Sequence, residues 1–335
     1  MCSSDLNAFR ALVQRLEQSA AARPGAYRAR VVALAVVGYA YILGTLVVLV
    51  ALTLLLVVSL RAAAVKLAIP LVVVIGAVLK SLWVRVTPPD GLPLTRERAA
   101  PLFDLVREVS GRLRAPRVDA ILALPELNAA IVQVPRLGIL GWYRNYLIVG
   151  LPLLQAVPPE EWRAILAHEM GHLSGSHGRF GAWIYRVRAT WGRLLDQLEK
   201  GQSRVGKLLF GRFVDWYAPY FNAYTFVLAR AHEYEADRAS AELVGAETAR
   251  RALTRIEIVG KQAEGFWETL YGGVARSPEP PPDSQHQLRA ALRAPAPSGD
   301  VAGWVAAAWR RPTDYSDTHP ALADRLKALG WEGAT

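Results

Sequence analysis

The stretch ILAHEMGHLSGSHGRF, residues 165–180, decides how the rest of this 335-residue chain is interpreted. His168 and His172 are four residues apart, which puts both imidazoles on one face of an α-helix. Glu169 projects beside any metal ion that this pair holds, where a base must lie to take a proton from water. The spacing predicts a zinc centre with catalytic chemistry. The alternative is two surface histidines and a solvated glutamate on an ordinary helix.

A third zinc ligand has to come from elsewhere in the chain. His177 is one place short of the third histidine of the metzincin pattern, a shift of about 100° around a helix, so we exclude it. In ARAHEYEADRAS, residues 229–240, Glu233 and Asp237 share a helix face whereas Glu235 points roughly the opposite way. Glu233 can complete a His, His, Glu set around one zinc ion, with the fourth position left to water. Asp237 can accept the N–H of a ligating histidine. Without the upstream motif, this segment would be an acidic solvated helix face.

The N-terminal part of the chain predicts a membrane anchor. Residues 31–60 carry no charge and are long enough, at about 1.5 Å per residue, to cross a hydrocarbon core of about 30 Å. The run is too long, starts too late and lacks the cleavage pattern of a signal peptide. We expect an integral membrane protein in contact with the lipid bilayer.

A second apolar stretch follows, and it can be interpreted in two ways. Its uncharged core is short, which is typical of a re-entrant or buried segment. It can be extended to a span over about 62–84 if Lys66 and Lys80 snorkel outward and Trp83 lies at the interface. We prefer a hairpin of two transmembrane helices, at about 31–60 and 62–84.

Positive charges predict the orientation of this anchor. The amphipathic lead-in, residues 1–30, and the stretch after the second apolar segment carry more arginine and lysine than the turn between the two segments. With two spans, both ends lie inside, and the catalytic domain faces the cytoplasm from a bacterial inner membrane. With one span, the same rule puts that domain outside.

The remaining sequence indicates an α+β domain over residues 87–335, after a membrane part over 31–86. Residues 87–95, TPPDGLPLT, predict a linker. Alternation in DAILALPELNAAIVQ and NYLIVG predicts strands, with a hairpin at PRLGILGW between them. VPPEEWRAILAHEMGHLSG predicts a helix with prolines near its start. The aromatic segment 213–230 is core or a face lying on the bilayer, with core preferred, and 275–299 predicts a flexible Pro-rich segment.

The composition limits the other function classes. The formal net charge is +10, mostly from arginine, but no zinc-finger pairing, basic aromatic helix or phosphate loop accompanies it. Membrane flanks and a basic surface explain this charge, so we expect no nucleic-acid partner. Cys2 is the one cysteine, which excludes an intrachain disulfide.

Together, AHEMGH and EYEAD, behind N-terminal membrane helices, resemble the HtpX-like and CAAX-prenyl-protease-like zinc metallopeptidases (metallopeptidase family forty-eight, gluzincin class). The resemblance implies a mainly α, α+β fold: an N-terminal transmembrane helical hairpin, then a zincin-like metallopeptidase domain with a small edge β-sheet. It implies that the first glutamate of the second motif is the zinc ligand, which favours Glu233 over Glu235. The expected activity is zinc endopeptidase cleavage of a membrane-associated protein or peptide, in membrane-protein quality control.

Further positions match patterns of this family. ELNAA resembles its edge strand, so Asn128 and Ala129 are expected to bind an extended peptide by strand addition. THPALADRL resembles its histidine-proline motif, making His319 a candidate for stabilising the oxyanion. Arg230 and Arg325 are weaker candidates for orienting acidic groups. HtpX relatives often carry two more spans after the catalytic helix, but here that stretch is too charged, at Arg186, Arg188 and Arg193, for a membrane-enclosed chamber. A catalytically silent zinc-binding scaffold is the alternative function.

Overall fold

The computed structural model describes residues 3–60, 64–82, 87–136, 143–174, 204–274, 283–296, 298–314 and 319–333, with residues 279 and 281 and short pieces between 180 and 196. The chain forms two compact units. The first unit consists of Met1–Val86, Pro135–Trp142 and Phe180–Ala229, and the second of Thr87–Val134, Tyr143–Arg179 and Arg230–Thr335. The second unit therefore begins where the sequence indicated a boundary, but residues 180–229 group with the N-terminal helices.

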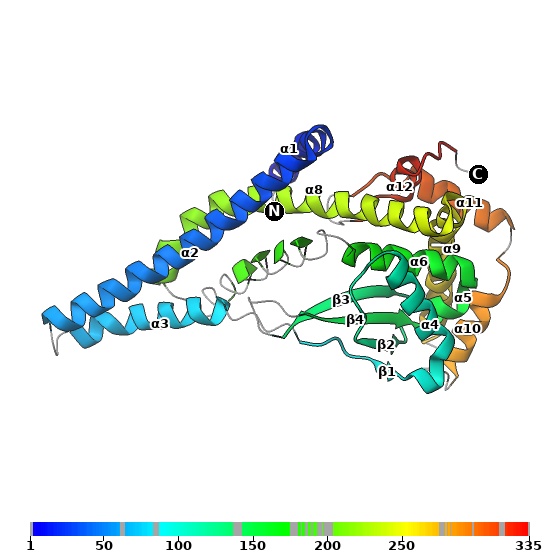
Figure 1. The fold of residues 1–335 in the computed structure, drawn as a ribbon, viewed down its shortest axis with the longest axis horizontal. Helices are drawn as coiled ribbons and strands as arrows, with labels where there is room; N and C mark the ends of the chain where they lie inside the picture. Colours follow the sequence, from blue (N-terminus) through cyan, green and yellow to red (C-terminus); the bar gives the residue numbers. More distant parts are fainter. Residues whose placement is uncertain are drawn as a thin grey trace. The chain divides into compact units, whose positions relative to one another are not determined.

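Long helices build the first unit (Figure 1). They are α1 (Ser3–Ala22), α2 (Pro24–Leu60), α3 (Ala64–Leu82) and the part of α8 (Arg204–Val244) up to Ala229. Helix α2 begins at Pro24, within the lead-in predicted for 1–30, and the fixed φ of proline suits a first helical position.

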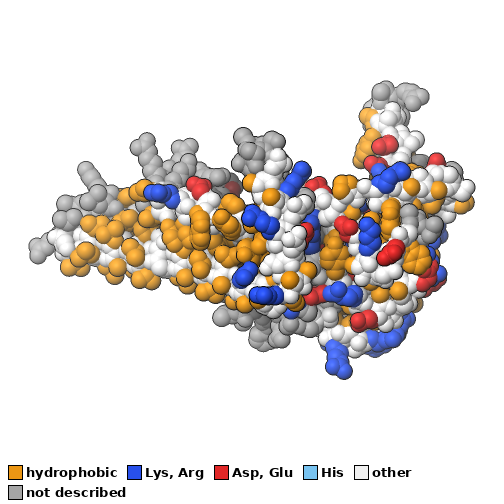
Figure 2. Space-filling view, turned by 90° about the horizontal axis from the view of Figure 1, so that it is seen from above, with side chains coloured by type: hydrophobic (Ala, Val, Ile, Leu, Met, Phe, Trp, Pro, Cys, Tyr) orange, Lys and Arg blue, Asp and Glu red, His pale blue; other side chains and the backbone are white. Residues whose placement is uncertain are grey.

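Among the described residues, α2 is the one helix long and apolar enough to cross a membrane, over Pro24–Ser59. Helix α3 packs beside α2, and its apolar part, Ile69–Lys80, is shorter. Large hydrophobic side chains remain exposed on both helices, and Figure 2 shows them over this part of the molecule. Trp83, the expected interface residue, lies outside the described residues.

The second unit contains a small mixed sheet. Its strands are β1 (Leu92–Leu94), β2 (Ala120–Leu124), β3 (Ala129–Pro135) and β4 (Tyr143–Gly150), in the order β1-β2-β4-β3. Strand β1 pairs antiparallel with β2, and β2 pairs parallel with β4, with Ala120 opposite Tyr146.

The sheet differs from the sequence prediction in two places. The predicted linker at 87–95 contains β1, and the stretch DAILALPELNAAIVQ forms two strands, β2 and β3, that are not neighbours in the sheet because β4 lies between them. Most of the predicted hairpin at PRLGILGW, residues 137–142, lies outside the described residues.

Helix α6 (Pro159–Leu173) of the second unit carries the AHEMGH motif, and α8 carries EYEAD. The remaining described helices are α4 (Arg96–Arg112), α5 (Leu151–Ala156), α9 (Ala246–Gly272), α10 (Ser284–Arg293), α11 (Ser298–Arg310) and α12 (Leu322–Ala328). Helix α6 contacts both α4 and α9, and its buried Leu166 and Met170 share one core with Ile121 and Leu147 of the sheet. Burial of such side chains contributes about 1.5–3 kcal/mol each, so α6 is held as a rigid element.

The segment predicted to be flexible, residues 275–299, contains helix α10. Leu288 and Leu292 of this helix are buried in a core with Val259 of α9. The four-residue spacing of Leu288 and Leu292 fits one face of a helix. The helix was missed because it has only ten residues and lies within a proline-rich stretch.

Candidate active site

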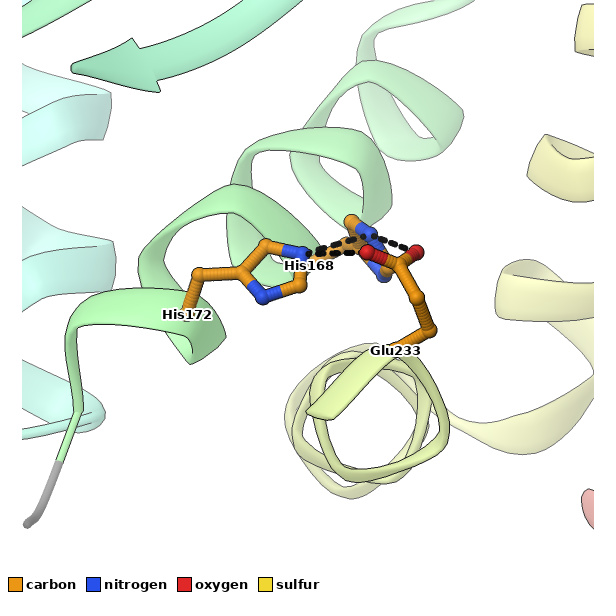
Figure 3. Close-up of side chains that lie close together, drawn as sticks. All are labelled: His168, His172 and Glu233. Carbon is orange, nitrogen blue, oxygen red and sulfur yellow. Dashed lines mark hydrogen bonds and ion pairs between the residues drawn. The ribbon is translucent and has the colours of Figure 1, made fainter. Parts of the chain in front are cut away.

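Helices α6 and α8 bring the three predicted zinc ligands together (Figure 3). The Nε2 atoms of His168 and His172 are 3.2 Å apart. The Glu233 carboxylate lies 3.5 Å from Nε2 of His168 and 3.4 Å from Nε2 of His172. Ligand atoms at about 2.0–2.1 Å from a tetrahedral zinc ion lie about 3.3–3.4 Å from one another. The Glu233 separations involve two different oxygens, Oε2 towards His168 and Oε1 towards His172, so the carboxylate faces both imidazoles. One ligand atom from each residue lies within 4.8 Å of the others, which is compatible with a single metal ion.

The state of the Glu233 carboxylate also fits a cation. Its Oε2 atom is buried and makes no hydrogen bond within the described residues, with imidazole nitrogens no nearer than 3.5 Å. Burial alone would raise the pKa of this carboxyl, but His168 and His172 outweigh burial and lower it to about 2. An ionised oxygen without a donor in a buried place is costly unless a metal ion completes it.

Asp237 and Arg325 orient the first histidine. His168 Nδ1 lies 2.9 Å from Asp237 Oδ1, so Nδ1–H can donate to the carboxylate while Nε2 faces the metal position. Arg325 of α12 donates to both Asp237 oxygens, at 2.6 and 2.8 Å. Burial raises the pKa of Asp237, but the hydrogen bond from Arg325 dominates the opposing effects and lowers it to about 2. The buried carboxylate therefore stays charged and fixes the histidine.

The two histidines differ in their affinity for protons. Burial lowers the pKa of His172 to about 4, and the charge of His168 adds to this effect. Burial also lowers the pKa of His168, but its hydrogen bond with Asp237 and the nearby Glu233 carboxylate outweigh burial and raise it to about 9. The acidic partners that favour a proton on His168 favour a metal cation in the same place.

A close approach of two helices makes this ligand set possible. A Cβ added at Gly171, between the two histidines, would lie 3.0 Å from Cα of Ala236 on α8. The Ser240 hydroxyl donates to the Ala164 carbonyl at 2.8 Å, a second link between the same helices. Small residues on both sides therefore let α6 and α8 approach until imidazoles and carboxylate share one ion.

Glu169 and His319 lie beside the ligands. Both line a cleft of ≈ 200 Å³ together with His168. Burial raises the pKa of the Glu169 carboxyl, which suits a group that must take and return a proton. His319 is largely exposed, with Nε2 3.7 Å from Oε2 of Glu233.

Asn128 and Ala129 line the same cleft, at the start of β3. Strand β3 ends the sheet order, so it is an edge strand. The Gly150 N–H donates to the Asn128 carbonyl at 2.7 Å, and a side chain at Gly150 would collide with this backbone, 2.1 Å from the Glu126 carbonyl. Gly150 thus holds the residues expected to bind a peptide against the sheet.

Two cleft features were missed by the sequence analysis. Helix α9 supplies an apolar wall with Ala249, Ala252, Leu253 and Ile256, opposite Leu127 and Leu153. The role of Gly171 in helix approach was missed as well. Gly171 is part of the AHEMGH motif, but its contact with Ala236 of α8 depends on how α8 packs against α6, which the sequence does not show.

Other candidates lie elsewhere. Arg230 donates to the Asp314 carbonyl, which links α8 to the segment before α12. Glu235 does not belong to the three-residue ligand group. His177 lies outside the described residues.

The site has two histidines and a glutamate around one point, with another glutamate beside them. This is the donor set of H-E-x-x-H metallopeptidases. Residues 114–332 match the family model described as Peptidase family M48. The chain belongs to this family, which confirms the resemblance carried by AHEMGH and EYEAD.

Curated relatives share the name Protease HtpX. That of Chromohalobacter salexigens is 27% identical over 176 residues, 45% of this chain and 56% of the relative. That of Stutzerimonas stutzeri is 25% identical over 230 residues, 64% of this chain and 69% of the relative. The chain thus spans about half the length of the first of these relatives. The crystal structure of S. mikatae Ste24p aligns with a TM-score of 0.37 and 14% identity, over 87% of this chain and 63% of that one. No argument rests on so distant a likeness.

Proposed function

We propose that this chain is a membrane-anchored zinc metalloendopeptidase that hydrolyses peptide bonds in protein substrates. The observation that carries the proposal is the convergence of His168, His172 and Glu233, whose ligand atoms, one from each residue, all lie within 4.8 Å of one another, with Glu169 lining the adjoining cleft. A structural zinc site has no use for a base at this position. His168, His172 and Glu233 would hold the metal.

When bound, zinc would polarise the scissile carbonyl and lower the pKa of an attacking water. Glu169 takes the proton of that water and later delivers it to the leaving amine. His319, at the cleft, donates a hydrogen bond to the charge that develops on the carbonyl oxygen. Asp237 and Arg325 keep His168 in the tautomer whose Nε2 faces the metal.

The cleft supports a substrate that binds as an extended strand. Asn128 and Ala129 at the edge of the sheet would offer backbone groups to the peptide. The apolar wall of α9 favours a large apolar side chain next to the scissile bond, because its alanines leave space and its walls exclude water. Such side chains are abundant in membrane proteins, which agrees with a quality-control role.

The membrane anchorage rests on the exposed apolar surface of α2 and α3. With both helices crossing, the catalytic unit lies on the cytoplasmic side of a bacterial inner membrane; with α2 alone, it lies outside. A reporter enzyme fused after Pro93 distinguishes the two, because activity on the outer face would contradict the two-span orientation.

Glu169→Gln is the experiment that tests catalysis. The variant should keep zinc, since the ligands are intact, but lose hydrolysis by at least about 10²-fold, as expected for removal of a general base. A catalytically silent scaffold predicts no peptidase activity in the wild-type protein either. Full activity in the variant would refute the role of Glu169.

A further inference from the structure

Helix α2 is too long to lie in hydrocarbon throughout. Its 37 residues extend about 55 Å, whereas the hydrocarbon core of a bilayer is about 30 Å thick. A tilt large enough to bury all of it exceeds the usual range of about 0–40°. Only part of α2 can cross, and its two halves differ in what covers them.

One face of the first half of α2 is covered by α8 (Figure 1), while Val32, Val36 and Val37 remain exposed. Three contacts pair successive residues of α2 with successively earlier residues of α8: Tyr27 with Tyr224, Leu34 with Tyr217, and Tyr41 with Phe213. The tyrosine hydroxyls of the first two pairs donate to backbone carbonyls across the contact, at 2.9 and 3.0 Å. The helices approach closely at Gly38, where an added Cβ would lie 2.5 Å from the Tyr217 hydroxyl. This part of α8 therefore runs antiparallel to residues 27–41.

The outer face of α8 at this level is not suited to hydrocarbon. Its exposed positions include Arg212, Asp215 and Asn222. The charged side chains of Arg212 and Asp215 are strongly disfavoured at the centre of a bilayer. Between them lie Trp216, 54% exposed, and Tyr220, 45% exposed. Tryptophan and tyrosine gather where hydrocarbon meets headgroups.

The second half of α2 exposes more large apolar side chains than the first half does. Its exposed large side chains are all aliphatic: Leu43, Val47, Val48, Val50, Leu52, Leu54, Leu55, Val57 and Val58. Helix α3 packs beside α2 and exposes Ile69, Val72, Val73 and Leu79 before Lys80 near its end. Residues 42–60 and the 19 residues of α3 each extend about 28 Å, close to the hydrocarbon thickness of about 30 Å.

We infer that residues 42–60 of α2, together with α3, cross the hydrocarbon layer, whereas residues 24–41 and the adjoining part of α8 lie among headgroups and in water. The stacked pair Tyr41 and Phe213, with ring centroids 3.8 Å apart, marks the boundary, and Trp216 and Tyr220 lie on the headgroup side of it. This inference rests on the proposed membrane anchorage but places the boundary about ten residues after the start of the charge-free run at residue 31, because hydropathy does not register what α8 exposes beside it.

Spin labels report the depth of single positions in lipid vesicles. In a Cys2→Ser background, one cysteine is placed at Val36, Val48, Val73 or Asn222 and labelled in the full-length protein. Collision with oxygen, which concentrates in hydrocarbon, is compared with collision with a water-soluble nickel complex. Zinc content and circular dichroism check that each variant is folded. Val32→Cys serves as a second position in the first half of α2 in case Val36→Cys does not fold.

Val36 discriminates best, because hydropathy puts it inside hydrocarbon and the contacts with α8 put it outside. The expected result is that labels at Val48 and Val73 favour oxygen, and labels at Val36 and Asn222 favour nickel. A label at Val36 as lipid-exposed as that at Val48 would overturn the boundary. An oxygen-rich label at Asn222 would make α8 a further membrane segment and overturn it too. Nickel access at Val48 would contradict the anchor itself, whatever the peptidase activity.

Discussion

Gly171→Ala tests whether the zinc site depends on the close approach of α6 and α8. The added Cβ would lie 3.0 Å from Cα of Ala236 and 3.3 Å from Cβ of Ala239. Because carbon atoms pack at about 3.5–4.0 Å, the overlap is about 0.5–1 Å. Overpacking of this kind costs about 1–3 kcal/mol, against a gain of about 1 kcal/mol from replacing a helical glycine. The nearest atom belongs to the backbone, so no side-chain rotation relieves the clash.

The strain acts on the ligands because Gly171 lies between His168 and His172, and Ala236 lies beside Glu233. Moving the helices apart lengthens the 3.4–3.5 Å separations between the carboxylate and the imidazoles. If about 1.4 kcal/mol of strain is relieved by losing the metal, zinc affinity falls about tenfold.

Competition with a chromophoric chelator measures this zinc affinity, and denaturant unfolding measures the stability change. Gly265→Ala is the matched control, since its added Cβ meets nothing within 4 Å in helix α9. It should leave zinc binding unchanged and add about 0.5–1 kcal/mol to the free energy of unfolding. Wild-type zinc affinity in Gly171→Ala would refute the argument.

Four further predictions concern the ligands, the residues that orient them and the cleft. Glu233→Ala should lower the bound zinc, while Glu235→Ala should not; metal analysis of the purified proteins decides. Asp237→Asn should weaken zinc binding about 10–100-fold, as measured by chelator competition, because the hydrogen bond that orients the histidine loses its charge. Arg325→Gln should lower the free energy of unfolding by about 3 kcal/mol, as measured by denaturant unfolding, because it removes the arginine partner of the buried Asp237 carboxylate. Ala252→Leu should lower kcat/KM at least about tenfold for peptides with a large apolar residue beside the scissile bond, and leave glycine-containing peptides unaffected.

Wild-type stability in Arg325→Gln would contradict the stabilising role of its ion pair with Asp237. Zinc loss in Glu235→Ala would move the third ligand. Unchanged zinc affinity in Asp237→Asn would remove its orienting role. For the cleft, Ala246→Leu is the control at an exposed position of the same helix. An equal loss in both leucine variants, or a loss on every peptide in Ala252→Leu, would contradict an apolar subsite.

The features that could be predicted from the sequence are those in which chemistry is local. The spacing of four residues places His168 and His172 on one helix face whatever surrounds them. The same rule separates Glu233 and Asp237 from Glu235. The structure brings His168, His172, Glu233 and Asp237 together. Asp237 lies 2.9 Å from Nδ1 of His168, and Glu233 lies 3.5 Å from Nε2 of the same residue.

The features that could not be predicted depend on contacts between distant segments. Strand β1 has only three residues and forms by pairing with β2. Helix α10 is fixed by burial of Leu288 against α9, which its proline-rich surroundings conceal. The level of the bilayer on α2 depends on what α8 exposes beside it, which hydropathy of α2 alone cannot register.

The most direct test of the account is an anomalous diffraction measurement at the zinc absorption edge, on crystals of the purified full-length protein. We predict one peak about 2 Å from Nε2 of His168, Nε2 of His172 and a carboxylate oxygen of Glu233. A peak ligated by other residues, or none at these three side chains in protein kept free of chelators, would contradict it.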